Sequence, residues 1–81
     1  VWGGEKMFSQ QCARAEQLAE LGYKAFKVEP MMSSPKDCVK LAKRARKTLG
    51  SKATLMVDVG YAFNDVPTVA RICRELEELD V

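Results

Sequence analysis

Two carboxylates and one lysine are the side chains of this sequence with the best prospects for chemistry. Asp58 lies between Val57 and Val59, so that a single charge ends an apolar stretch. An unpaired buried carboxylate is costly and needs a cation or N–H donors. Asp58 could therefore bind a hard metal ion such as Mg²⁺, which prefers carboxylate oxygens. The alternative is that it accepts hydrogen bonds from the loop that follows.

Lys27 and Glu29 share a second short apolar stretch. Residues two apart on a strand point to the same side, so both side chains fall on one face. Lys27 on the interior face would have to pair with a carboxylate, and Asp58 on the neighbouring strand is a candidate. It could instead extend its ammonium group to the edge. Glu29 could be a base, a substrate-binding group or the partner of that lysine.

An internal repeat indicates which elements position these residues. The segment 21–25, with the sequence LGYKA, recurs as LGSKA at 49–53, and each copy leads into an apolar stretch that ends in Glu29 or Asp58. A fainter third copy begins at Leu79. A period of about 30 residues suits one helix, one strand and two short loops, which together make one β/α unit.

Apolar residues at helical spacing predict three helices. The first runs over residues 9–21 and the second starts after the N-cap Ser34 and ends at Gly50. The third starts near Asp65. We expect the third helix to bury Val66, Val69, Ala70, Cys73 and Leu76.

The expected strands are Ala25–Glu29 and Ala53–Asp58, with a further strand near Val1–Gly3. The strands at 25–29 and 53–58 are short and apolar, which is typical of parallel strands covered by helices. Right-handed crossovers would place their carboxyl ends, with both carboxylates, at one edge of the sheet. The sequence therefore predicts an α/β fold in which residues 1–81 form three consecutive β/α units of an incomplete (β/α)₈ barrel, without a second domain. The competing fold is a flavodoxin-like sheet.

Composition narrows the classes of function. The 81 residues are 47% hydrophobic and 30% charged, as in an ordinary globular chain. Histidine is absent, which excludes Ser–His and Cys–His catalysis and histidine-bound zinc within this chain. The net charge of +2 gives no argument for nucleic acid, and no apolar run is long enough for a membrane span. The three cysteines form no CxxC pair, so we expect buried thiols in a cytoplasmic protein.

The pattern resembles the barrel domain of the enolase superfamily, in the branch of mandelate racemase and muconate lactonizing enzyme. The resemblance covers about residues 12–81 and rests on AELGYKAFKV at 19–28, a helix with VKLAKRAR, and ATLMVDV at 53–59. It implies Mg²⁺ bound by three carboxylates at the ends of the third, fourth and fifth strands, and Asp58 matches the first of these. In that family the metal stabilises the enediolate left when a base removes the α-proton of a carboxylate substrate.

The sequence departs from that family at two positions. Many relatives carry Lys-x-Lys on the second strand, where Lys27 matches the earlier lysine and Glu29 replaces the basic one. Gly60 stands where an asparagine is frequent. Glu29-Pro30 is similar to an acid–proline pattern of sugar-acid dehydratases in this branch. The resemblance thus implies a dehydratase or racemase for a sugar acid or another small carboxylate, with the base on a later strand.

These expectations apply to an intact protein, which we expect to be a homo-oligomer. The chain alone should hold metal poorly and be inactive, because one or two carboxylates do not fill an octahedral shell. The alternative from a different class is a non-catalytic α/β module that dimerises through its exposed sheet edge.

Overall fold

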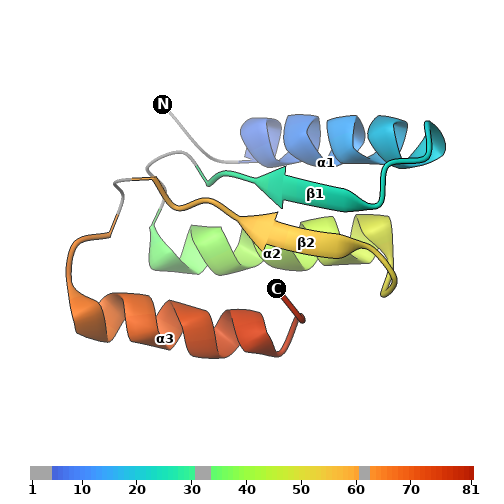
Figure 1. Cartoon of the computed structure of the whole chain (residues 1–81). Coiled ribbons are helices and arrows are strands. Elements are labelled where there is room, and N and C mark those ends of the chain that lie inside the picture. Colours follow the sequence, from blue (N-terminus) through green and yellow to red (C-terminus); the bar gives the residue numbers. More distant parts are fainter. Residues whose placement is uncertain (1–4, 31–33, 61–62) are drawn as a thin grey trace.

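The computed structural model describes residues 5–30, 34–60 and 63–81, which form alternating helices and strands (Figure 1). The expected strand near Val1–Gly3 lies outside the described residues. In chain order the elements are α1 (Glu5–Glu20), β1 (Ala25–Val28), α2 (Pro35–Leu49), β2 (Thr54–Val57) and α3 (Val66–Glu77).

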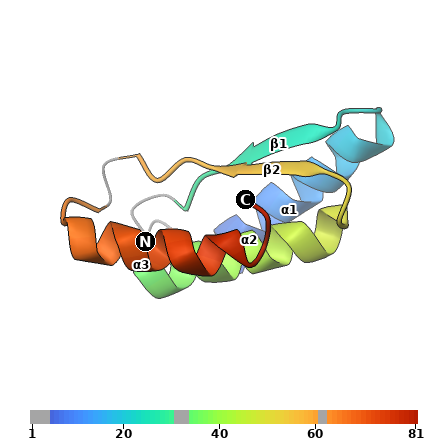
Figure 2. The same ribbon diagram turned by 60° about the horizontal axis from the view of Figure 1, so that its bottom comes forward.

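The two strands are adjacent and parallel, and their register runs from Ala25 opposite Thr54 to Val28 opposite Val57. All three helices lie on the same side of this sheet (Figure 2). A flavodoxin-like sheet has helices on both faces, whereas a barrel wall has them on its outer face only. The fold is therefore α/β and matches part of a barrel domain, as the sequence predicted.

The repeat in the sequence marks the helix ends. Gly22 and Gly50 have positive φ angles of 101° and 82°, and each follows a helix. Asp80 holds the corresponding place after α3 with φ 55°. The N–H groups of Gly22 and Asp80 each donate to a carbonyl three residues earlier, as in a Schellman helix end. The third copy of the repeat is therefore a structural copy as well.

Two apolar clusters join the helices to the sheet, and α2 contributes to both. Leu41 and Ala45 of α2 belong to the first cluster, between α1, α2 and the sheet. Ala42 belongs to the second, between α2 and α3. The other buried members are Phe8, Cys12, Val28 and Leu55 in the first cluster, and Cys38, Val39, Ile72 and Leu76 in the second.

The expected buried face of α3 was wrong at two residues. Val66 is 80% exposed, and Cys73 is exposed as well. The helix instead packs Ile72 and Leu76 against α2, in a cluster that Val57 of β2 also joins. Successive residues lie about 100° apart around a helix, so a face centred on Ile72 turns Cys73 away. Among the described helices α3 packs against α2, and Val66 at its start stays exposed.

Arg46 links three elements by hydrogen bonds at the end of the sheet opposite to the strand tips. Its guanidinium donates to the carbonyls of Gly50 (2.9 Å) and Ala53 (2.7 Å), which frame the entry to β2. It also donates to the carbonyls of Leu79 (2.9 Å) and Asp80 (3.0 Å), after α3. One side chain of α2 thereby fixes the ends of three elements.

Candidate active site

The register of the sheet places Glu29 and Asp58 side by side. Each is the residue directly after the last strand pair, Val28 opposite Val57. The Asp58 N–H donates to the Val28 carbonyl at 2.9 Å, which continues the strand pairing up to the carboxylates. The two acids therefore meet at the carboxyl edge of the parallel sheet, where α/β proteins build their sites.

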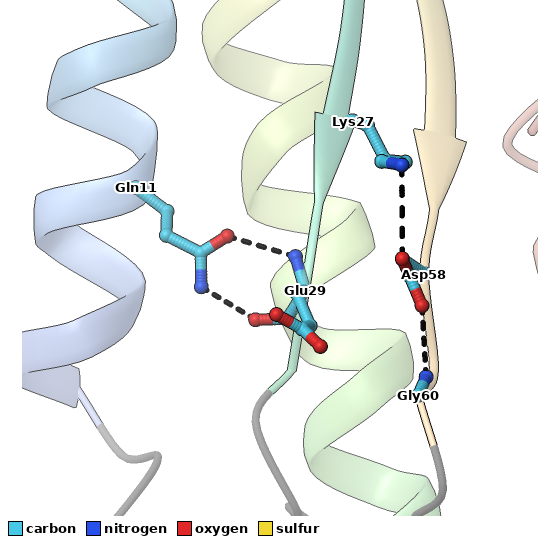
Figure 3. A network of polar contacts seen from close by, with 5 residues as sticks. All are labelled: Gln11, Lys27, Glu29, Asp58 and Gly60. Carbon is cyan, nitrogen blue, oxygen red and sulfur yellow. Dashed lines mark hydrogen bonds and ion pairs between the residues drawn. The ribbon is translucent and has the colours of Figure 1, made fainter.

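Among the described residues the Asp58 carboxylate makes two contacts, one with each oxygen (Figure 3). Oδ1 accepts a hydrogen bond from the Gly60 N–H at 2.9 Å. Oδ2 lies 3.7 Å from the Lys27 ammonium nitrogen. Of the two roles that the sequence left open for Asp58, metal ligand and loop acceptor, the contact with Gly60 is the second, and the contact with Lys27 is the pairing considered for that lysine. A carboxylate has about four lone-pair sites, so these contacts leave Asp58 the capacity for a metal ion.

Lys27 pairs with Asp58 across the strands, one of the arrangements that the sequence left open, rather than with Glu29 on its own strand. The side chains of the pair are 60% and 45% exposed. They lie on the face of the sheet that the helices leave open, because the helices bury the alternate residues Phe26, Val28 and Leu55. In a closed barrel this open face is the interior.

Glu29 is held through its backbone by a residue that the sequence analysis missed. The side-chain amide of Gln11, on α1, donates to the Glu29 carbonyl at 2.6 Å and accepts from the Glu29 N–H at 2.9 Å. Gln11 lies next to Cys12, in the apolar stripe of α1. A polar residue inside that stripe was the one signal that could have identified it.

The donor chemistry of Asp58 fits a divalent cation, because carboxylate oxygens are the ligands that Mg²⁺ prefers. Within the described ranges, however, no group of three His, Cys, Asp or Glu side chains is placed to hold a metal ion. The described residues therefore offer one candidate ligand, Asp58, with Glu29 on the neighbouring strand, and not a complete metal site.

Two titratable groups away from these residues, Cys38 and Asp65, have shifted pKa values and structural roles. Burial raises the pKa of the Cys38 thiol, with a smaller contribution from Cys73. Cys38 is fully buried between α2 and α3, so it is a core residue and not a nucleophile. Hydrogen bonds from Thr68 lower the pKa of Asp65, which caps α3 by accepting from the Thr68 N–H at 3.0 Å.

The fold corresponds to one wall of an α/β barrel, with two carboxylates, Glu29 and Asp58, at its strand tips. The chain belongs to the enolase C-terminal domain-like family, whose sequence pattern matches residues 10–81. This agrees with the resemblance to the mandelate racemase and muconate lactonizing enzyme branch. A comparison with curated proteins gave no match.

One solved structure supports the same assignment. It is described as that of a "putative racemase" and superimposes with a TM-score of 0.83 at 26% sequence identity. The match covers 91% of this chain and 20% of the solved chain. This chain therefore spans about a fifth of the length of that protein. None of the described helices is long and apolar enough to cross a membrane.

Proposed function

We propose that the intact protein is a Mg²⁺-dependent enzyme that removes the α-proton of a carboxylate substrate. Sugar acids are the proposed substrate class, and dehydration is the proposed outcome. The observation that carries this proposal is the place of Asp58: it directly follows β2 at the carboxyl edge of the sheet, within a chain that belongs to the enolase C-terminal domain-like family.

In this proposal Asp58 is one of the ligands of Mg²⁺. The bound cation would offset the negative charge that develops on the substrate carboxylate when the α-proton leaves. The Gly60 N–H and the Lys27 ammonium hold the two Asp58 oxygens from different directions, which fixes the orientation of the ligand. Lys27 itself lies on the open face, where it can bind a substrate carboxylate.

Glu29 is assigned a role in proton transfer to the substrate hydroxyl group. Dehydration needs a proton for the hydroxyl that leaves, and a carboxyl group beside the metal ligand can supply it. The Glu29-Pro30 sequence favours dehydration over racemisation. Pro30 is fully buried, so the chain is anchored directly after Glu29. The base that takes the α-proton would come from another strand of the barrel.

The alternative, a module that dimerises through its sheet edge, is disfavoured by one contact. The Glu29 N–H and C=O point to the outer edge of β1, and the Gln11 amide already binds both. That part of the edge therefore offers no backbone groups to a second copy of the chain.

The proposal is tested with the intact protein, Mg²⁺ and a panel of sugar acids, by measuring 2-keto acid products and epimers separately. Asp58→Asn should lower turnover by about two orders of magnitude or more. Asp80→Asn is the matched control, because it changes an aspartate at the opposite end of the sheet and asparagine tolerates positive φ. Near-normal turnover of Asp58→Asn would contradict the proposal. A purely epimerised product would replace dehydration by racemisation.

A further inference from the structure

The position of Glu29 depends on two residues outside its own strand, Gln11 and Gly60. We infer that both are positioning residues for Glu29: Gln11 fixes its peptide groups, and Gly60 leaves the space that its carboxylate occupies. The relevance of this inference to catalysis rests on the proposed function, in which Glu29 exchanges protons with the substrate.

Gln11 acts on Glu29 in the way that a neighbouring strand would. Val28 uses its carbonyl to pair with β2, so the peptide groups of Glu29 point to the opposite side, toward α1. There the Gln11 amide donates at 2.6 Å and accepts at 2.9 Å (Figure 3). Because the Gln11 amide donates one bond and accepts the other, it fixes the peptide groups on both sides of Glu29 at the strand tip.

Gly60 controls the space on the other side of Glu29. It has a φ of 57°, and its N–H donates to Asp58 Oδ1 at 2.9 Å. A Cβ atom at position 60 would lie 3.3 Å from Glu29 Oε1, which is tighter than ordinary van der Waals contact. The Glu29 carboxylate therefore sits against the backbone of the loop that holds Asp58.

Together these contacts set the separation of the two carboxylates. Gln11 prevents the Glu29 backbone from moving outward. The close contact made by a side chain at position 60 would therefore have to be relieved by movement of the Glu29 side chain itself. Substitution at position 60 should thus act on Glu29 even where the backbone of residue 60 is undisturbed.

The first test is a double-mutant cycle between Gly60→Asn and Glu29→Ala in the intact protein. Asparagine tolerates the left-handed backbone, so Gly60→Asn adds a Cβ with little strain. With Glu29 present, Gly60→Asn should lower kcat on the sugar-acid substrate about tenfold and leave KM nearly unchanged. A tenfold loss corresponds to about the free energy of one misplaced hydrogen-bonding group. In the Glu29→Ala background it should have no further effect. Equal losses in both backgrounds would overturn the role of Gly60.

The second test measures hydrogen exchange of the Glu29 amide in the intact protein by mass spectrometry of peptides that cover β1. Gln11→Ala removes the acceptor of this amide and should raise its exchange rate about tenfold or more. Gln10→Ala is the matched control on the same helix, because Gln10 is exposed, and it should leave the rate unchanged. An unchanged rate in Gln11→Ala would overturn the role of Gln11.

The same variants separate this inference from the proposed function. Hydrogen exchange and urea unfolding need no turnover, so they remain informative if no sugar acid is converted. Gly60→Asn should lower the urea midpoint more when Glu29 is present than in Glu29→Ala, where only the backbone strain at position 60 remains. If the wild-type protein is inactive but these couplings are observed, the proposed function is rejected and the positioning roles of Gln11 and Gly60 are retained. If the protein is active but the couplings are absent, the proposed function is retained and the positioning roles are rejected.

Discussion

The Lys27 ammonium nitrogen lies 3.7 Å from the Asp58 carboxylate, across two parallel strands. Both side chains are about half exposed, and an exposed ion pair contributes only about 0–1 kcal/mol to stability. We therefore expect the location of this pair to matter more than its contribution to stability. It occupies the open face of the sheet beside Glu29, where both charges are open to solvent and, in the proposed function, to a substrate.

Replacement of Lys27 by methionine should separate function from stability. Lys27→Met should change the free energy of unfolding by less than about 1 kcal/mol, because the pair is exposed. Turnover of the intact enzyme should fall about 100-fold, because a charge close to the reacting groups is lost. Lys24→Met, an exposed lysine before β1, is the control and should remain active. If Lys27→Met kept the activity of Lys24→Met, Lys27 would have no role in the site.

Replacement of Arg46 by methionine should have the opposite profile. The variant loses four hydrogen bonds to backbone carbonyls at the end of the sheet away from the strand tips. The free energy of unfolding, measured in urea, should fall by about 2–4 kcal/mol, since hydrogen bonds to charged groups are among the stronger ones. Lys47→Met, at the exposed neighbouring position, should be close to neutral. A loss below about 0.5 kcal/mol would contradict this account.

The centre of the first apolar cluster is tested at Leu41, whose side chain is fully buried. Leu41→Ala should destabilise the protein by about 2–5 kcal/mol, because it removes buried methyl groups and leaves a cavity. Leu21→Ala is the comparison, since Leu21 is 75% exposed and its truncation should cost less than about 0.5 kcal/mol. Similar losses for both variants would show that α2 does not pack as described.

The pKa of Cys38 gives a prediction for alkaline pH. Burial raises this pKa above the ordinary value of 9.0, so the folded state keeps the proton to higher pH than the unfolded state. The resulting stability is fully present below pH 9 and is lost as the pH rises through the folded-state pKa. The urea midpoint should therefore fall more steeply above pH 9 in the wild type than in Cys38→Ala, each relative to its own value at pH 7. Parallel pH curves would contradict the raised pKa.

Local signals in the sequence were enough to predict most of the fold. The Ser34 cap was confirmed, with its hydroxyl accepting from the Asp37 N–H at 3.2 Å, and Gly50 ends α2 as expected. The parallel pairing and the place of Glu29 and Asp58 at one edge of the sheet were confirmed too. These features follow from caps, periodicity and the direction of parallel strands, which neighbouring residues determine.

The errors concern contacts that no local pattern determines. The burial of Val66 and Cys73 depends on which neighbour α3 meets, and periodicity alone does not distinguish the face toward α2 from the face beside it. The contact between Gln11 and Glu29 joins residues 18 positions apart on different elements. The contact forms only once the tertiary structure brings the two residues together, so the local sequence around either residue does not predict it.

The central claim is that Asp58 supports Mg²⁺-dependent removal of an α-proton. The most direct measurement is the ¹H NMR signal of the α-proton of a sugar acid in D₂O, with the intact protein present. The signal should disappear with Mg²⁺, through exchange or product formation, and persist with EDTA or with Asp58→Asn. Loss of the signal at the same rate in all three samples, or its persistence with wild-type protein and Mg²⁺ for every acid of the panel, would contradict the account.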